Sequence, residues 1–176
     1  MRILPCTPPW LRLALSLALS FTASSGFADD LNDHILSLRD RAQITDQILE
    51  DRLETVVPEV MRAAGIDAWV LIAREYNEDP IVKTMLPATW LNARRRTVLM
   101  FIDQGPELGV ARMAVARYPV GKLFPGVWNP EQQPDQYGRI AQILDEANPA
   151  RIALNYSDVY ALADGLTYSE QRDFLQ

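Results

Sequence analysis

The chain has 176 residues and a formal net charge of −6, with 48% hydrophobic and 23% charged residues. This composition is typical of a globular domain and excludes collagen-like and disordered classes. The acidic balance argues against a nucleic-acid-binding protein, which would show a basic face. The only cysteine is Cys6 and the only histidine is His34, so we expect no Cys–His zinc site and no Ser–His catalytic pair within this chain.

Residues 1–28 have the three parts of a secretory signal peptide. A positively charged start precedes an apolar segment that is too short to span a bilayer, and Gly26 and Ala28 supply the small residues of a cleavage site. We therefore expect cleavage between Ala28 and Asp29, export to the periplasm or the medium, and no membrane span after the signal is removed. A buried core helix is the alternative interpretation of this segment.

The first helix of the exported part is expected over residues 46–64, where apolar residues recur at helical spacing. Thr45 is the expected N-cap and Gly65 the expected end. Pro58 lies inside the pattern and predicts a kink or two abutting helices. The apolar run over 66–73 follows at once and predicts a buried strand.

The middle of the chain is less regular. A polar loop and a proline-interrupted stretch occupy residues 74–93. The runs over 97–103 and 110–118 predict a hairpin around a Gly-Pro turn. Four prolines within 119–135 predict an extended surface loop.

The last part of the chain returns to alternating helices and strands. The expected elements are a helix over 136–147 ended by Asn148 and Pro149, a strand over 151–156, a short helix capped by Ser157 or Asp158 and ended by Gly165, and a helix that begins at Thr167 or Ser169. Helices that alternate with buried strands indicate a layered α/β domain.

Two charged groups are the candidates for binding chemistry. Glu75, Glu78 and Asp79 could hold a cation at a strand end, although a solvated loop is the simpler interpretation. The run 94–96 consists of three arginines and could receive a carboxylate bidentately. Its alternative role is a charged segment that keeps the entrance of a strand soluble.

Other single residues have mainly structural interpretations. Trp69, Trp90 and Trp128 are expected to pack in the core, although Trp90 and Trp128 lie in irregular segments and could face a partner domain. Asn155 begins a match to the N-glycosylation pattern, at a predicted strand end where chance matches are common. His34 is expected on the surface.

Several short segments, taken in order, resemble one known family. They are Arg39-Asp40-Arg41, Gly65-Ile66-Asp67-Ala68-Trp69, residues 74–80, Arg94-Arg95-Arg96-Thr97, residues 149–157 and Ala163-Asp164-Gly165-Leu166-Thr167. Together they resemble the N-terminal, creatinase-like domain of the pita-bread metallopeptidases, which include Xaa-Pro aminopeptidase, prolidase and creatinase. The likeness covers most of residues 38–175.

The resemblance implies a fold and a set of partners. The implied fold is a mixed β-sheet flanked by helices, a ribonuclease H-like layered domain at residues 29–165, with residues 166–176 starting a linker helix. Relatives continue into a catalytic domain in which two aspartates, one histidine and two glutamates hold two divalent metal ions. None of those ligands is matched in this chain, so we expect it to hold no cofactor and to be inactive alone.

The resemblance also implies a site and a substrate class. The domain would form homodimer contacts, and Tyr76, Trp90 and Arg94 would lie at the entrance through which proline-containing peptides reach the active site. The loop 74–80 differs from the commoner aminopeptidase P pattern.

Two hypotheses from different classes follow. The first is that the chain is the front part of an exported metallopeptidase that cleaves beside proline. The second is that it is a stand-alone, non-catalytic binding or interaction domain. Phe174 and Leu175 begin an apolar helix face with little left in this chain to cover it, and this favours a continuation into a further domain.

Overall fold

The computed structural model describes residues 35–176, and residues 42–176 form one compact unit. The helices are α3 (Leu38–Asp51), the π-helical segment η1 (Arg52–Val56), α4 (Val57–Ala64), α5 (Pro80–Thr84), α6 (Gln136–Ala147), the 3-10 turn η2 (Ala161–Ala163) and α7 (Tyr168–Phe174). The strands are β1 (Ala68–Arg74), β2 (Arg96–Asp103), β3 (Val110–Val115) and β4 (Ile152–Leu154).

The four strands form one mixed sheet in the order β3-β2-β1-β4. β1 pairs antiparallel with β2, and β2 pairs antiparallel with β3, as expected of the predicted hairpin. β4 returns after the loop and α6, and pairs parallel with β1. The α/β class predicted from the sequence is therefore confirmed.

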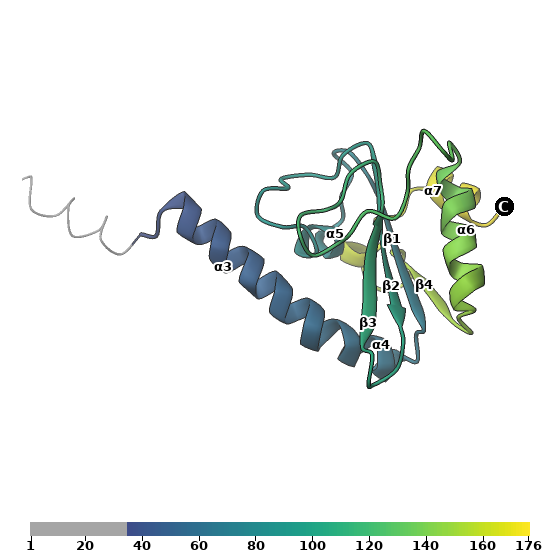
Figure 1. Cartoon of the computed structure of the whole chain (residues 1–176), viewed down its shortest axis with the longest axis horizontal. Coiled ribbons are helices and arrows are strands. Elements are labelled where there is room, and N and C mark those ends of the chain that lie inside the picture. The colour runs from purple at the N-terminus through teal and green to yellow at the C-terminus, as the bar shows by residue number, and fades with distance from the viewer. Residues whose placement is uncertain (1–34) are drawn as a thin grey trace, which may run out of the picture. The chain divides into compact units, whose positions relative to one another are not determined.

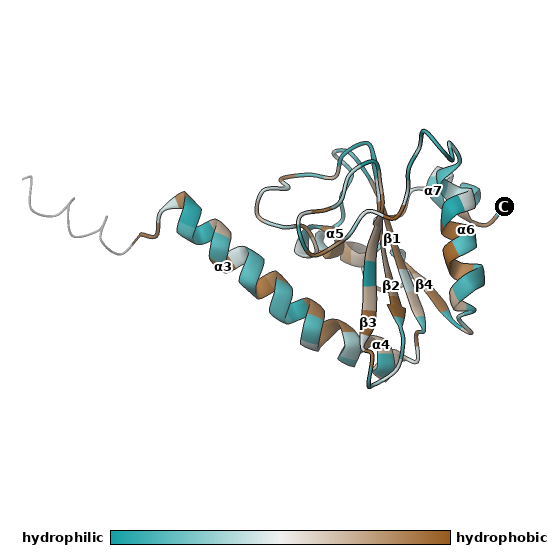
Figure 2. Cartoon of the chain, viewed as in Figure 1, coloured by the Kyte–Doolittle hydropathy of each residue, from teal (hydrophilic) through white to brown (hydrophobic). Residues whose placement is uncertain are grey.

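The sheet is covered on both faces because its strands alternate their side chains between two apolar clusters. Leu71 and Leu99 point into the cluster that contains α4 and α5, whereas Val70 and Val98 point into the cluster under α6. Figure 1 shows α6 along one side of the strands and α5 on the other. Figure 2 shows the apolar colouring of the strands and of the α6 surface that faces them.

The helix pair before β1 is longer than predicted, and the N-cap prediction at Thr45 is wrong. The helix α3 begins at Leu38, and Thr45 lies in its interior. Ser37 precedes the helix, where its hydroxyl accepts a hydrogen bond from the backbone N–H of Asp40 at 3.2 Å. A serine three residues before an acid is an N-terminal signal in its own right. The polar segment 38–45 consists mainly of good helix formers, which explains the extension.

Pro58 has the predicted effect of two abutting helices. It stands in the first turn of α4, where a missing backbone N–H costs least. The preceding turn is widened to a π-helix, in which the N–H of Val57 donates to the carbonyl of Arg52. Leu49, Leu53, Val57 and Met61 are buried, so the widened turn keeps one apolar side of the pair on the sheet.

The later elements agree with the sequence except in two places. Gln136–Ala147 is helical and ends at Asn148 in the left-handed conformation (φ 46°). Thr167 is the N-cap of α7. The helix predicted after Ser157 is wrong, because this segment forms only the short turn η2. The helix α5 was not predicted.

Phe174 also differs from expectation. It packs, partly buried, against the cluster under α6, so this chain does cover it, whereas Leu175 is exposed. Within residues 35–176, no helix combines the length and apolar character that a membrane crossing requires.

Candidate functional site

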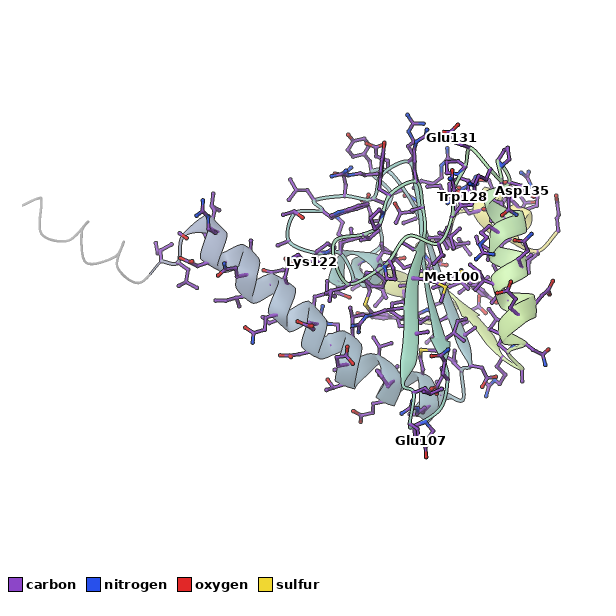
Figure 3. All side chains as sticks on the ribbon, viewed as in Figure 1. Met100, Glu107, Lys122, Trp128, Glu131 and Asp135 are labelled. Carbon is purple, nitrogen blue, oxygen red and sulfur yellow. The ribbon has the colours of Figure 1, made fainter. Side chains whose placement is uncertain are left out.

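The predicted site residues lie on two loops at one end of the sheet. We call these the strand-end loops: residues 74–80, which follow β1, and residues 90–96, which precede β2. Arg74 pairs with Arg96 in the antiparallel register, so the two loops leave the sheet together. The turn between β2 and β3 lies at the opposite end, where Figure 3 labels Glu107.

Two carboxylates tie the strand-end loops together. The N–H of Glu75 donates to the carbonyl of Arg95 at 2.7 Å, and the Glu75 carboxylate accepts from the N–H of Arg95 at 3.2 Å. The Glu78 Oε1 atom accepts from the backbone N–H of Tyr76 at 3.1 Å and of Ala93 at 2.7 Å. Carboxylates that accept backbone N–H groups make strong, charge-assisted hydrogen bonds, so these loops are well ordered relative to each other.

Tyr76 is the more exposed of the two aromatic residues predicted at the entrance. Its backbone has φ 67°, in the left-handed region that favours glycine, and the residue is 82% exposed. A bulky residue in this conformation is uncommon and has an energetic cost. The hydrogen bond from its N–H to Glu78 holds it there, so the ring is presented to solvent from a constrained backbone.

The structure brings Trp90 and Arg94 together. The Arg94 Cζ atom lies 4.6 Å from the centre of the Trp90 ring, in cation–π geometry. Trp90 itself is only 9% exposed and packs in the α4–α5 cluster, so it behaves as a core residue. The pair therefore places a fixed guanidinium group above a buried indole. It lies on the loop 90–96, which Glu78 connects to Tyr76 through its hydrogen bonds to Ala93 and Tyr76.

The three acidic residues of the loop accept hydrogen bonds from the backbone of this chain. Asp79 is buried, where its carboxylate caps α5 by accepting from the N–H of Val82 at 2.8 Å. Glu75 and Glu78 bind backbone N–H groups, as described above. The solvated-loop interpretation is therefore wrong for Asp79. Among residues 35–176, no group of three or more His, Cys, Asp or Glu residues could hold a metal ion.

The arginine run 94–96 is divided among three roles. Arg94 stacks on Trp90, and Arg95 is exposed at φ 55°. Arg96 does receive a carboxylate, as the run suggested, but the carboxylate belongs to Glu170 of the same chain. The Arg96 Nε atom lies 2.9 Å from Glu170 Oε2, and the Arg74 Nε atom lies 3.5 Å from Glu170 Oε1.

Glu170 is the most deeply buried charged side chain of this end of the sheet, with 3% of its side chain exposed. Besides the two arginines it accepts a short hydrogen bond from the Tyr137 hydroxyl, and Arg96 stacks over the Tyr137 ring at 4.7 Å. Burial raises the pKa of Tyr137, and the hydrogen bond to Glu170 raises it further. The cluster attaches α7 and α6 to the sheet.

A second polar cluster closes the edge of β1. Asn155 is 4% exposed, and its side-chain amide exchanges hydrogen bonds with the N–H of Ile72 at 2.9 Å and with the carbonyl of Ile72 at 3.0 Å. The same amide nitrogen donates to Asp79 at 2.8 Å. A glycan on Asn155 is incompatible with these contacts, so the N-glycosylation match is a chance one.

Sequence reasoning missed Glu170 and the role of Asn155. The spacing of Thr167 and Glu170 is that of a capping box, which predicts a local contact. Thr167 does accept from the N–H of Glu170 at 3.4 Å, but the Glu170 carboxylate turns to the arginines instead. No local pattern marks such a long-range contact.

Trp69 and Trp128 pack as predicted. Trp69 is partly buried, with its ring 5.5 Å from that of Phe101. Trp128 packs against the cluster under α6, and its Nε1 donates to the carbonyl of Gln133 at 2.7 Å. The signal peptide, its cleavage site at Ala28 and Asp29, and His34 lie outside the described residues.

The chain was compared with protein-family models, curated proteins and solved structures, and it matches none of them.

Proposed function

We propose that this chain is the non-catalytic N-terminal domain of an exported Xaa-Pro-type metallopeptidase, and that it shapes the entrance to the active site. The motif order that resembles the creatinase-like domain supports this assignment, and a mixed sheet with helices on both faces is compatible with it. The hydrolytic chemistry and its two metal ions would belong to a separate domain, so no hydrolytic step is assigned to residues 35–176.

One observation carries the entrance role. Tyr76 is held in a costly backbone conformation while its ring is almost fully exposed, next to a loop that carries the Trp90–Arg94 stack. Constrained, exposed residues of this kind gather where a surface makes specific contacts. Aromatic surfaces are suited to proline-rich peptides, whose rigid rings dock at little entropic cost.

Each of the three residues has a distinct role in this proposal. The Tyr76 ring would contact the apolar face of a proline-containing peptide. The Arg94 guanidinium, oriented by the indole of Trp90, would attract the carbonyl oxygens or the carboxylate of the same peptide. Trp90 would act only through Arg94, because its own ring is buried.

The proposal includes a homodimer. The outer side of the helices before β1 carries the exposed apolar residues Ile48, Val56 and Val60, which support such a contact. Sedimentation of the protein and of an Ile48→Glu, Val60→Glu variant tests it. We expect a dimer that the variant dissociates, and a wild-type protein that stays monomeric at every concentration would contradict it.

Sequencing of the natural transcript tests the domain assignment. A continuation that encodes a domain with two aspartates, one histidine and two glutamates as metal ligands would support it. A stop codon directly after the codon for Gln176 would overturn it.

Kinetics of the complete peptidase test the entrance role. Tyr76→Ala should lower kcat/KM for Xaa-Pro peptides about two- to tenfold, because an aromatic contact is worth about 0.5–1.5 kcal/mol. Tyr168→Ala is the matched control, since Tyr168 is also an exposed tyrosine but lies in the first turn of α7. Equal effects of the two substitutions would remove Tyr76 from the entrance.

A specific surface favours the alternative of a stand-alone interaction domain. The segment around η2 exposes several large apolar or aromatic side chains, namely Tyr156, Val159, Tyr160, Leu162 and Tyr168. Such a concentration is typical of a protein-binding surface. Under this alternative, Tyr160→Ala would weaken binding to an apolar partner segment and Tyr76→Ala would not.

A further inference from the structure

A small cleft at the strand-end loops is lined by four charged residues only. Arg74, Glu75, Arg95 and Arg96 enclose a volume of about 320 Å³. Three guanidinium groups and one carboxylate therefore share a space large enough for a small ligand group. This cleft is separate from the Tyr76 ring and from the Trp90–Arg94 stack.

Two of the four charged groups around the cleft already have partners within the chain. Arg96 is paired with Glu170 at 2.9 Å. The Glu75 carboxylate accepts from the N–H of Arg95 at 3.2 Å, so it is bound to the backbone rather than to a guanidinium group. With Glu170 included, the cleft and its direct partners hold three arginines and two carboxylates, a net charge of +1. The chain as a whole is acidic, with a net charge of −6.

Two guanidinium groups remain available. No hydrogen bond or ion pair joins the Arg95 side chain to any residue between 35 and 176. The Arg74 Nε atom lies 3.5 Å from Glu170 Oε1, a looser pairing than that of Arg96, and 58% of the Arg74 side chain is exposed. The planar forks of both groups are suited to binding two oxygens of one anion.

The backbone places Arg95 against the local conformational preference. Its φ of 55° is in the region where glycine is favoured, and two hydrogen bonds with Glu75 hold it there. The guanidinium group is thus presented from a fixed backbone position beside the cleft that Arg74 also lines. We propose that this cleft is an oxyanion-binding site, in which Arg95 and Arg74 bind a phosphate or carboxylate group. The proposal is independent of the peptidase function.

The test uses the whole 176-residue chain, titrated at constant ionic strength with inorganic phosphate in one arm and with acetate in the other. Amide chemical shifts of residues 74–75 and 95–96 report binding. Saturation by phosphate alone identifies a phosphate site, saturation by acetate alone identifies a carboxylate site, and saturation by both identifies a general oxyanion site.

Arg95→Gly is the decisive variant, because glycine adopts the same φ without cost and the fold is therefore kept. We expect it to lower anion affinity at least about tenfold, which corresponds to about 1.4 kcal/mol. Lys122→Gln removes one exposed positive charge on another loop (Figure 3) and should leave affinity unchanged. The proposal is overturned if neither anion saturates, or if Arg95→Gly binds as the wild-type protein does.

Discussion

The side chain of Asn155 pairs with the backbone of Ile72 as the next residue of β4 would. Both the N–H and the carbonyl of Ile72 are satisfied by this one amide, at 2.9 and 3.0 Å. The strand β4 ends at Leu154, which pairs with Val70. Without the Asn155 side chain, the backbone of Ile72 would have no partner on this edge of β1. The amide also reaches Asp79, which connects the sheet edge to the cap of α5.

Asn155→Ala should therefore destabilise the domain strongly. It leaves two buried backbone groups of Ile72 unpaired, at a cost of about 1–3 kcal/mol for each group. Urea unfolding measures the change. Asn129→Ala is the control, because Asn129 is exposed and its side chain accepts a single local hydrogen bond, from the N–H of Glu131, so a change of about 0.5 kcal/mol is expected. Equal losses in the two variants would contradict the pairing role.

Gly165→Ala should also destabilise, for a steric reason. A Cβ atom at Gly165 would lie 2.2 Å from the Oδ2 atom of Asp79 and 2.3 Å from its Cβ atom, so the capped end of α5 would have to shift. We expect a loss of about 1–3 kcal/mol in urea unfolding. At Gly126 the nearest heavy atom would be 3.4 Å away, and Gly126→Ala should be tolerated. A tolerated Gly165→Ala would show that the close approach to Asp79 is not maintained.

Glu170→Gln tests the cluster that attaches α7 to the sheet. The substitution preserves shape but removes the charge that Arg96 pairs with and that accepts from the Tyr137 hydroxyl. A hydrogen bond to a charged group contributes about 1.5–3 kcal/mol. Glu131→Gln is the control, because it makes the same substitution in an ion pair on the surface, where Glu131 (Figure 3) lies 2.8 Å from Arg117. An exposed pair contributes about 0–1 kcal/mol. Unfolding in guanidinium chloride measures the free energy of unfolding of each variant. Equal losses in the two variants would argue against the buried cluster.

The stability of the domain should fall at alkaline pH through Tyr137. Its pKa is raised in the folded state, so folding favours the neutral phenol. The contribution of Tyr137 to the free energy of unfolding is complete below its pKa in the unfolded chain, about 10. It is lost as the pH rises through its pKa in the folded chain. Tyr137→Phe should flatten this decline, and Tyr168→Phe, at an exposed site, should not. Urea midpoints between about pH 8 and pH 11 measure the slopes.

The ion pair between Arg62 and Asp103 predicts the behaviour at acid pH. Two hydrogen bonds of 2.9 Å join these side chains, and the Arg62 guanidinium lowers the pKa of Asp103. The stabilisation by this ion pair is therefore present above the pKa of Asp103 in the unfolded chain, about 3.9. It is lost as the pH falls through the pKa of Asp103 in the folded chain. Asp103→Asn should reduce the acid dependence of the urea midpoint. Asp145→Asn, on the exposed side of α6, should leave it unchanged.

Elements whose signals are local could be predicted from the amino-acid sequence. The apolar run over 97–103 predicted β2, the partly alternating run over 110–118 predicted its hairpin with β3, and the period of 136–147 predicted α6 with its end at Asn148. These signals depend only on the next few residues along the chain, which is why they can be read without a fold. The start of α3 was misplaced because Ser37 and Asp40 form a capping signal ahead of the apolar pattern.

The roles of the charged and amide side chains depend on contacts between distant parts of the chain. Arg94, Arg95 and Arg96 are consecutive, yet one stacks on an indole, one is free at the surface, and one is paired with a carboxylate far along the chain. Asn155 matches a glycosylation pattern and serves instead as a strand mimic. A polar side chain can satisfy its hydrogen bonds with any partner that the fold brings near, and sequence distance does not limit that choice.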